Sequence, residues 1–184
     1  MIFQSLNQIY IYDTKTSRFS IIKPKNKILK AFEANNSLYF QVANEGLFEI
    51  ENGKSKLVSS DSLVVNNKII AIFSIDNGLL IKTQLNGFYS FINGKFIPFF
   101  SAINAKIESS SVYSCIQLSD KGFAIGTVSN GIFILSDSGK LKYHITQSTG
   151  ISNNTVLALF EDIEKNLWIG LDNGINCVNL QSPI

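Results

Sequence analysis

A glycine recurs along this chain at nearly constant spacing, inside segments that resemble one another. The segments are "LYFQVANEGLFEI" (38–50), "LLIKTQLNGFYSF" (79–91), "FAIGTVSNGIFIL" (123–135) and "LWIGLDNGINCV" (167–178). They align on Gly46, Gly87, Gly131 and Gly174, which are 41, 44 and 43 residues apart. A fixed period of this length indicates a repeat architecture, so single motifs are interpreted within the repeat.

Two further sets of turn residues keep the same period. One set precedes the segments and has pivots spaced 42, 44 and 44 residues apart, at Asn36, Gly78, Gly122 and Asn166. The other follows the first three segments, at Gly53, Gly94 and Gly139. Asn and Gly enter positive φ cheaply and suit the tight turns that join antiparallel strands. Each period is therefore predicted to hold three hairpin turns and four strands.

The segments between the turns are short and rich in β-branched and aromatic residues, which favours strands. No stretch shows an apolar helical stripe with caps. Four antiparallel strands in each period of about 40 to 45 residues are typical of a β-propeller blade. We therefore predict an all-β fold, a propeller arc of about four to five blades in an incomplete ring. A solenoid would need helical pairs, and a sandwich would not keep the turns in register.

The repeat divides the chain into five parts. A blade remnant lacking its first strand covers 1–27, complete blades cover 28–67, 68–110 and 111–154, and a partial blade lacking its fourth strand covers 155–180. Residues 181–184 are predicted to be a linker. An open arc exposes strand edges and an apolar blade face. We therefore expect either that the chain is part of a longer propeller or that copies of it associate.

The composition excludes several classes of function. The chain has 45% hydrophobic and 16% charged residues, and its 16 basic and 14 acidic side chains are scattered. This argues against a nucleic-acid surface or a polybasic membrane patch. The N-terminus does not read as a signal peptide, and no run of 18 apolar residues could span a bilayer. The protein is predicted to be either cytoplasmic or a piece of a longer exported protein. Cys115 and Cys177 lie in apolar strand-like runs, which favours buried free thiols over a bridge.

No catalytic, cofactor or metal site is predicted. His144 is the only histidine and lies on an expected outer strand, so a zinc site or a catalytic triad would have to use one imidazole. "GLFEIENGKS" resembles a phosphate loop but has six residues between Gly46 and Gly53 where that motif has four. The carboxylates follow the repeat, which favours hydrogen bonds within turns over a singular acid-base pair; they are Asp76, Asp120, Glu161 and Asp162.

Trp168, the only tryptophan, lies beside Asp172 in "NLWIGLDNGIN" and could be interpreted as a binding site. Its counterparts in the repeat are Tyr39, Leu80 and Ala124, so the position is a variable, mainly apolar strand position. Packing within the blade is favoured over stacking on a ligand. This interpretation predicts that Trp168→Ala costs several kcal/mol of stability.

Residues 150–180, "GISNNTVLALFEDIEKNLWIGLDNGINCVNL", resemble the two-component regulator propeller repeat of bacterial sensor proteins. The shared features are the Gly-Ile-Ser-Asn-Asn opening, an apolar strand ending in Glu-Asp, and Leu-Trp-Ile-Gly followed by Asp-Asn-Gly. Residues 123–135 form a weaker copy, and the first two repeats replace the Ile-Gly step with Phe40-Gln41 and Ile81-Lys82. The ending "NLQSPI" resembles the exit toward an Ig-like domain.

The resemblance implies a large sensor whose propellers lie outside the inner membrane and signal to a histidine kinase or a DNA-binding output. We therefore expect a non-enzymatic sensory module that binds a signal or transmits its binding. By family analogy, oligosaccharides are a plausible signal class. The alternatives are a scaffold that binds another protein, with the rest of a propeller or a second copy as partner, and a fragment of a glycan-active propeller enzyme.

Overall fold

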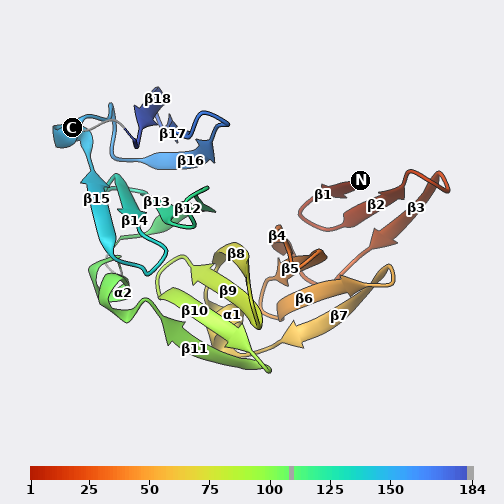
Figure 1. Cartoon of the computed structure of the whole chain (residues 1–184). Coiled ribbons are helices and arrows are strands. Elements are labelled where there is room, and N and C mark those ends of the chain that lie inside the picture. The colour runs from red at the N-terminus through yellow and green to blue at the C-terminus, as the bar shows by residue number, and fades with distance from the viewer. Residues whose placement is uncertain (108–109, 182–184) are drawn as a thin grey trace. The chain divides into compact units, whose positions relative to one another are not determined.

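The computed structural model describes residues 1–107 and 110–181 and consists mainly of antiparallel hairpins (Figure 1). The chain divides into two compact units, and each is described by itself. The first comprises residues 1–81 and 90–96, and the second residues 82–89 and 97–184. None of the described helices is long and apolar enough to cross a membrane.

The chain begins with a three-stranded and a four-stranded sheet, whose spatial order follows the sequence. The strands of the first sheet are β1 (Ile2–Gln4), β2 (Ile9–Asp13) and β3 (Arg18–Ile22). The strands of the second sheet are β4 (Ile28–Ala34), β5 (Ser37–Val42), β6 (Gly46–Glu51) and β7 (Lys54–Ser59). The helix α1 (Ser62–Asn66) follows β7. Within each of these two sheets, every pair of sequential strands is a hairpin, as the turn residues predict.

Three further sheets follow in the same antiparallel order. The third sheet holds β8 (Ile69–Ile75), β9 (Gly78–Thr83), β10 (Gly87–Ile92) and β11 (Lys95–Phe99), and α2 (Ser101–Ile107) follows it. The fourth holds β12 (Val112–Gln117), β13 (Phe123–Thr127), β14 (Ile132–Leu135) and β15 (Leu141–Ile145), followed by the 3-10 turn η1 (Gln147–Thr149). The last holds β16 (Val156–Glu161), β17 (Asn166–Leu171) and β18 (Gly174–Asn179).

The predicted all-β fold class, built from antiparallel blade-like sheets, is confirmed. The five sheets lie within the five predicted segments 1–27, 28–67, 68–110, 111–154 and 155–180. Of the predicted linker 181–184, only Gln181 belongs to the described residues.

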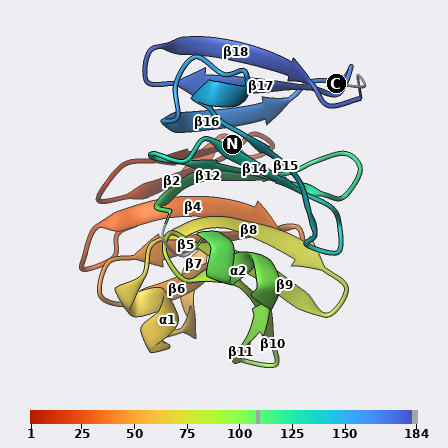
Figure 2. The same cartoon turned by 90° about the vertical axis from the view of Figure 1, so that its left-hand side faces the viewer.

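The short helices α1 and α2 correct the expectation from sequence, which found no helical stretch (Figure 2). Each has at most two turns, which is too short to display an apolar stripe of period 3.6. The signal that could have found α1 is its N-cap. The Asp61 carboxylate accepts a hydrogen bond from the Leu63 backbone N–H at 2.8 Å, which satisfies a donor that the first turn leaves unpaired.

A β-bulge recurs in the first strand of three sheets. The register shifts between Ile28 and Lys30 in β4, between Val112 and Ser114 in β12, and between Val156 and Ala158 in β16. The extra residue at each shift is a large apolar side chain that is at least partly exposed; these residues are Leu29, Tyr113 and Leu157. The bulges explain why the first strands are apolar at consecutive positions without being buried throughout.

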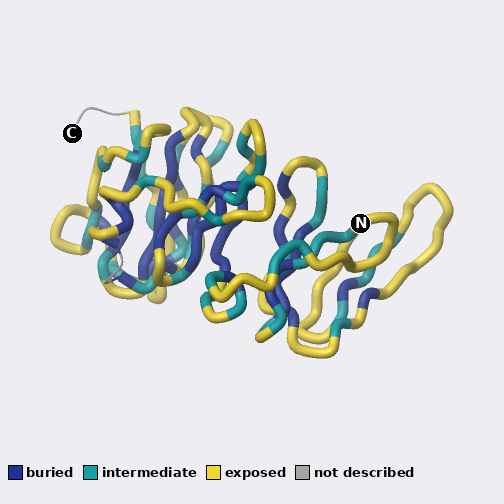
Figure 3. Tube along the Cα trace, turned by 90° about the horizontal axis from the view of Figure 1, so that it is seen from below, coloured by how far each residue is buried: buried dark blue, intermediate teal, exposed yellow. Residues whose placement is uncertain are grey.

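Each unit has its own hydrophobic core, formed where one sheet packs on the next. Figure 3 marks the buried stretches of the chain in dark blue. In the first unit, the β1–β3 sheet packs on β4–β7 through Ile9, Ile22, Ile28, Phe40 and Val42. The opposite side of β4–β7 contributes Phe32, Tyr39 and Leu47 to a cluster with Val64, Ile69, Ile72, Leu79 and Ile81. In the second unit, the β12–β15 sheet packs on β16–β18 through Ala124, Ile132, Ile134, Val156, Leu167 and Ile169.

Candidate functional site

The four glycines that define the repeat lie at or just before the start of the third strand of their sheets. All have positive φ, from 66° at Gly131 to 140° at Gly174. A Cβ atom at Gly46 or Gly131 would collide with the carbonyl oxygen of Ser59 or Ile145, and one at Gly87 with the Asn104 side chain. A Cβ atom at Gly174 would meet nothing within 4 Å, since no strand within the described residues pairs with the outer edge of β18.

The predicted turn pivots differ in conformation from one another. Asn36 has a φ of 57°. In two later turns the left-handed residue is the preceding lysine, Lys121 with a φ of 66° and Lys165 with a φ of 65°. The pivots of those turns are Gly122 and Asn166. A Cβ atom at Gly122 would collide with the carbonyl oxygen of Leu135 in a neighbouring strand. A Cβ atom at Gly78 would collide in the same way with the carbonyl oxygen of Phe91.

The indole of Trp168 lies on the surface of the last sheet, which corrects its predicted place in the blade packing. It is 44% exposed, whereas its counterparts in the other repeats are buried; these are Tyr39, Leu80 and Ala124. The Nε1–H donates to Asp162 Oδ2 at 2.8 Å. This hydrogen bond, together with those from Asn166 and Glu164, holds the pKa of the Asp162 carboxyl below its usual value. Trp168 is therefore tied to a turn rather than to a core.

Because the indole is half exposed, we expect Trp168→Ala to cost about 1 kcal/mol of unfolding free energy, in place of the several kcal/mol of a core truncation. Urea unfolding at low protein concentration measures this. A loss of 3 kcal/mol or more would restore the core interpretation.

The other residues considered from sequence have structural partners. The His144 ring stacks on Phe133 with centroids 4.1 Å apart, and its Nε2 is 2.8 Å from the Asn130 carbonyl oxygen. Residues 46–55 form the β6–β7 hairpin, as expected in preference to a phosphate loop. No disulfide joins Cys115 and Cys177, as predicted, but Cys177 is exposed, which corrects the expectation that both are buried.

Two of the repeat carboxylates act within turns. Asp120 Oδ1 accepts from the Gly122 N–H at 2.8 Å, and Asp162 Oδ1 accepts from the Asn166 N–H at 2.8 Å. Glu161 does not, which corrects its prediction as a turn residue. Its carboxylate instead accepts from the Ser119 N–H at 2.6 Å and the Ser119 hydroxyl at 3.1 Å, linking two hairpins of the second unit.

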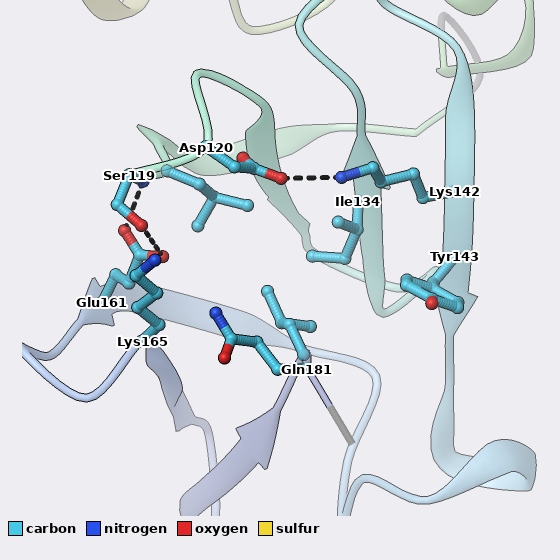
Figure 4. Close-up of a pocket in the computed structure, with 10 residues that line it drawn as sticks. Ser119, Asp120, Ile134, Lys142, Tyr143, Glu161, Lys165 and Gln181 are labelled. Carbon is cyan, nitrogen blue, oxygen red and sulfur yellow. Dashed lines mark hydrogen bonds and ion pairs between the residues drawn. The ribbon is translucent and has the colours of Figure 1, made fainter. Parts of the chain in front are cut away.

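A pocket of about 280 Å³ lies beside this link (Figure 4). It is built by the β12–β13 turn, strands β14 and β15, the β16–β17 turn and the residues after β18. Its lining consists of Leu118, Ser119, Asp120, Ile134, Lys142, Tyr143, Glu161, Lys165, Leu180 and Gln181. Sequence reasoning singled out Asp120 and Glu161 as repeat carboxylates but not the pocket, because its residues come from segments far apart in the chain.

Two of the pocket's charged groups are already paired. Lys142 Nζ lies 2.6 Å from Asp120 Oδ2. This contact holds the pKa of the Asp120 carboxyl below its usual value and raises that of the Lys142 ammonium. The Glu161 carboxylate is occupied by Ser119. Both walls are therefore held in place by interactions within the protein.

Lys165 and Gln181 remain available to a ligand. Neither side chain has a hydrogen-bonding or ion-pair partner within residues 1–107 and 110–181. In Figure 4 Gln181 lies between Lys165 and Tyr143. A cation, an amide and a phenol beside Leu118, Ile134 and Leu180 suit a small ligand with hydroxyl or carboxylate groups and an apolar face. Across the described residues no group of histidine, cysteine and carboxylate side chains is arranged to hold a metal.

Comparisons of sequence find no match among protein-family models or curated proteins. Comparison of structure finds the extracellular domain of BT4673 from B. thetaiotaomicron, described as a one-component or hybrid two-component system. In two structures of this domain the TM-score is 0.70 at 20% and 21% identity, over 98% of this chain and 26% of that one. The extracellular domain of BT3049, a hybrid two-component system of the same organism, has a TM-score of 0.65 at 23% identity, over 94% of this chain and 24% of that one.

These domains are propellers. The fold of this chain is therefore that of a β-propeller. Its five sheets are blades, and the chain spans about a quarter of the length of the two extracellular domains.

The propeller of virginiamycin B lyase from Staphylococcus aureus is also similar, with a TM-score of 0.66 at 17% identity, over 96% of this chain and 64% of that one. In that lyase a variant with a histidine replaced by alanine is catalytically inactive. The fold thus occurs in both sensors and enzymes, and function must be argued from the site.

Proposed function

We propose that this chain is a non-enzymatic sensory segment of an extracytoplasmic signalling receptor, and that the pocket between its last two blades binds a small saccharide signal. The observation that carries the proposal is the structural similarity, over 94% to 98% of the chain, to extracellular domains of two signalling systems. The resemblance of residues 150–180 to the propeller repeat of bacterial sensors supports it independently.

The pocket supports a saccharide as the class of ligand. Sugars combine hydroxyl groups with an apolar ring face, and the pocket sets Lys165, Gln181 and Tyr143 beside the aliphatic side chains of Leu118 and Ile134. The Lys165 ammonium favours a sugar that carries a carboxylate, since a charge-assisted hydrogen bond is stronger than a neutral one. The volume of about 280 Å³ restricts the bound part of the ligand to a small unit, such as the end of an oligosaccharide.

Titration calorimetry of the 184-residue chain with acidic and neutral oligosaccharides tests the proposal. We expect an acidic oligosaccharide to bind, and Lys165→Met to weaken its binding at least tenfold because the charge-assisted contact is lost, worth about 1.4 kcal/mol or more. Lys121→Met is the matched control, since Lys121 occupies the same left-handed turn position in the preceding blade but does not line the pocket.

Three results would contradict the proposal. Binding of no oligosaccharide would remove the ligand class, and equal effects of the two lysine variants would remove the pocket. Chromatography of the ligand after prolonged incubation addresses the enzyme alternative. Recovery of unchanged ligand is expected, and the appearance of a cleaved product would replace the sensor with a glycan-active enzyme.

A further inference from the structure

The blades of this chain cover one another in a repeated way. In the second unit, β16–β18 covers β12–β15, and Val156, Leu167 and Ile169 pack on Ala124 and Ile132. The approach is close, because a Cβ atom at Gly126 would collide with the Val156 side chain. In the first unit, β4–β7 covers β1–β3 in the same way, with Phe40 and Val42 on Ile9 and Ile22. Within each unit a blade therefore uses one face to cover the blade before it, and the earlier blade offers its opposite face for this contact.

The last blade has a face equivalent to the one that β12–β15 presents to β16–β18. Nothing in the described chain covers this face of the last blade. Strand register places Phe160, Trp168 and Cys177 in one cross-strand row, and Gly170 beside Ile175 in the next row. Phe160 is 64% and Ile175 71% exposed. Gly170 occupies the position that Gly126 has in the covered blade, but a Cβ atom there would meet only Ala158 of its own sheet. We call these five residues the C-terminal face.

The first blade has an exposed face on the side away from β4–β7, which nothing in the described chain covers. Register places Phe3, Tyr10 and Ile21 in one row and Tyr12 beside Phe19 in the next. This side is opposite to the one that Ile9 and Ile22 bury against β4–β7. Phe19 is 66% and Ile21 57% exposed. We call these five residues the N-terminal face, and it corresponds to the faces with which β4–β7 and β16–β18 cover the blades before them.

The two blades that carry these faces have opposite charge. Residues 1–27 hold five basic side chains and one acidic side chain, Asp13. Residues 155–181 hold four acidic side chains and one basic side chain, Lys165. None of these charged residues lies in the cross-strand rows that form the two faces. Opposite charge favours contact between these blades and disfavours contact of either blade with its own kind.

We propose that a second copy of this chain docks its N-terminal face on the C-terminal face, in the way that each blade covers the one before it. The contact is heterologous, because two different faces of the same chain meet. Aromatic and aliphatic side chains on both faces supply the buried core of the interface, and the opposite charges of the two blades favour this orientation.

Two single variants and their mixture test the proposal, with mass measured by light scattering during size-exclusion chromatography. We expect the mass of the unaltered chain to rise with concentration. Ile175→Lys blocks the C-terminal face and Ile21→Lys blocks the N-terminal face, so each variant alone should remain a monomer because it would have to bury an unpaired charge. Ile163→Lys is the matched control, since Ile163 is almost fully exposed in a turn and belongs to neither face.

The decisive result is expected from mixing the two blocked variants. The intact C-terminal face of the Ile21→Lys chain can receive the intact N-terminal face of the Ile175→Lys chain, so the mixture should form a 1:1 dimer that cannot grow further. Higher salt should weaken this dimer, because it screens the opposite charges. Circular dichroism and thermal unfolding of each variant establish that the substitutions leave the fold intact.

Other outcomes would overturn the proposal. An unaltered chain that stays a monomer at every concentration would show that a second copy does not cover these faces. Association abolished by Ile175→Lys but retained by Ile21→Lys, with no dimer on mixing, would indicate an isologous contact between two C-terminal faces. Failure of either kind leaves saccharide binding in the pocket to be judged separately by calorimetry.

Discussion

Replacing Gln41 with methionine is expected to lower the free energy of unfolding by about 4 kcal/mol. The Gln41 side chain is buried, and its amide makes three hydrogen bonds. Its Nε2 donates to the carbonyl oxygens of Val64 and Asn67 at 2.7 and 2.8 Å, and its Oε1 accepts from the Ile69 N–H at 2.8 Å. Methionine has nearly the same length but leaves these three backbone groups without a partner, at about 1–3 kcal/mol each before relaxation.

The bonds of Gln41 hold the end of α1 and the start of β8 against β5. The loss should therefore appear as faster amide exchange in residues 62–70 as well as lower stability in urea. Gln117→Met is the control, since Gln117 is an exposed glutamine at the end of β12, and we expect it to change stability by less than about 0.5 kcal/mol. A loss below 1 kcal/mol for Gln41→Met would mean that water replaces the amide.

The repeat could be read from the sequence because its turns depend on local chemistry. Asn36 and Gly46 need conformations or close approaches that few residues allow, and their spacing therefore reports the strand count. The contents of the blades depend on contacts between distant segments. Trp168 aligns with three buried residues, yet it is exposed because none of the described blades covers its face. Alignment gave the position of the side chain in its strand, but the environment is set by the neighbouring sheet.

The pocket shows the same division between local and distant chemistry. The carboxylates of Asp120 and Asp162 bond within their own turns, as their places in the repeat predict. Glu161 is adjacent in sequence to Asp162 but reaches Ser119 in another blade, 42 residues away. A strand alternates its side chains between two faces, so neighbouring carboxylates take different partners. Without the packing of the two sheets, neither this link nor the pocket beside it could be predicted.

The second residue of the Ile-Gly step is not the same in all the blades. It is Gln41, Lys82, Gly126 and Gly170 in turn. The glycine at position 126 leaves room for the Val156 side chain of the next blade to pack against it. Gln41 fills the position with a buried amide, which hydrogen-bonds to the backbone of Asn67 and Ile69 where the next blade begins. Lys82 fills it with a charge, so the same substitution at positions 41 and 82 should have opposite effects on stability.

Lys82→Met is expected to raise the free energy of unfolding by about 2 kcal/mol at pH 7. The Lys82 side chain is fully buried, its Nζ donates to the Thr83 carbonyl oxygen at 2.7 Å, and burial lowers its pKa from 10.5 to about 8. Carrying the buried charge at neutral pH costs the folded state about 3 kcal/mol, at 1.36 kcal/mol for each pKa unit. Methionine removes this cost but also the hydrogen bond to Thr83, worth about 1 kcal/mol.

The pH dependence distinguishes loss of a buried charge from better packing. Above pH 8 the folded protein releases the Lys82 proton, whereas the unfolded chain keeps it up to about 10.5. The unfolded state then binds more protons, so the stability that Lys82 withholds is regained as pH rises between these values. The gain in unfolding free energy from Lys82→Met, measured in urea, should therefore shrink with rising pH and vanish by about pH 10. Lys95→Met is the control, because Lys95 is exposed and its substitution should give no such pH-dependent gain. An advantage that is constant with pH would show that packing is its source.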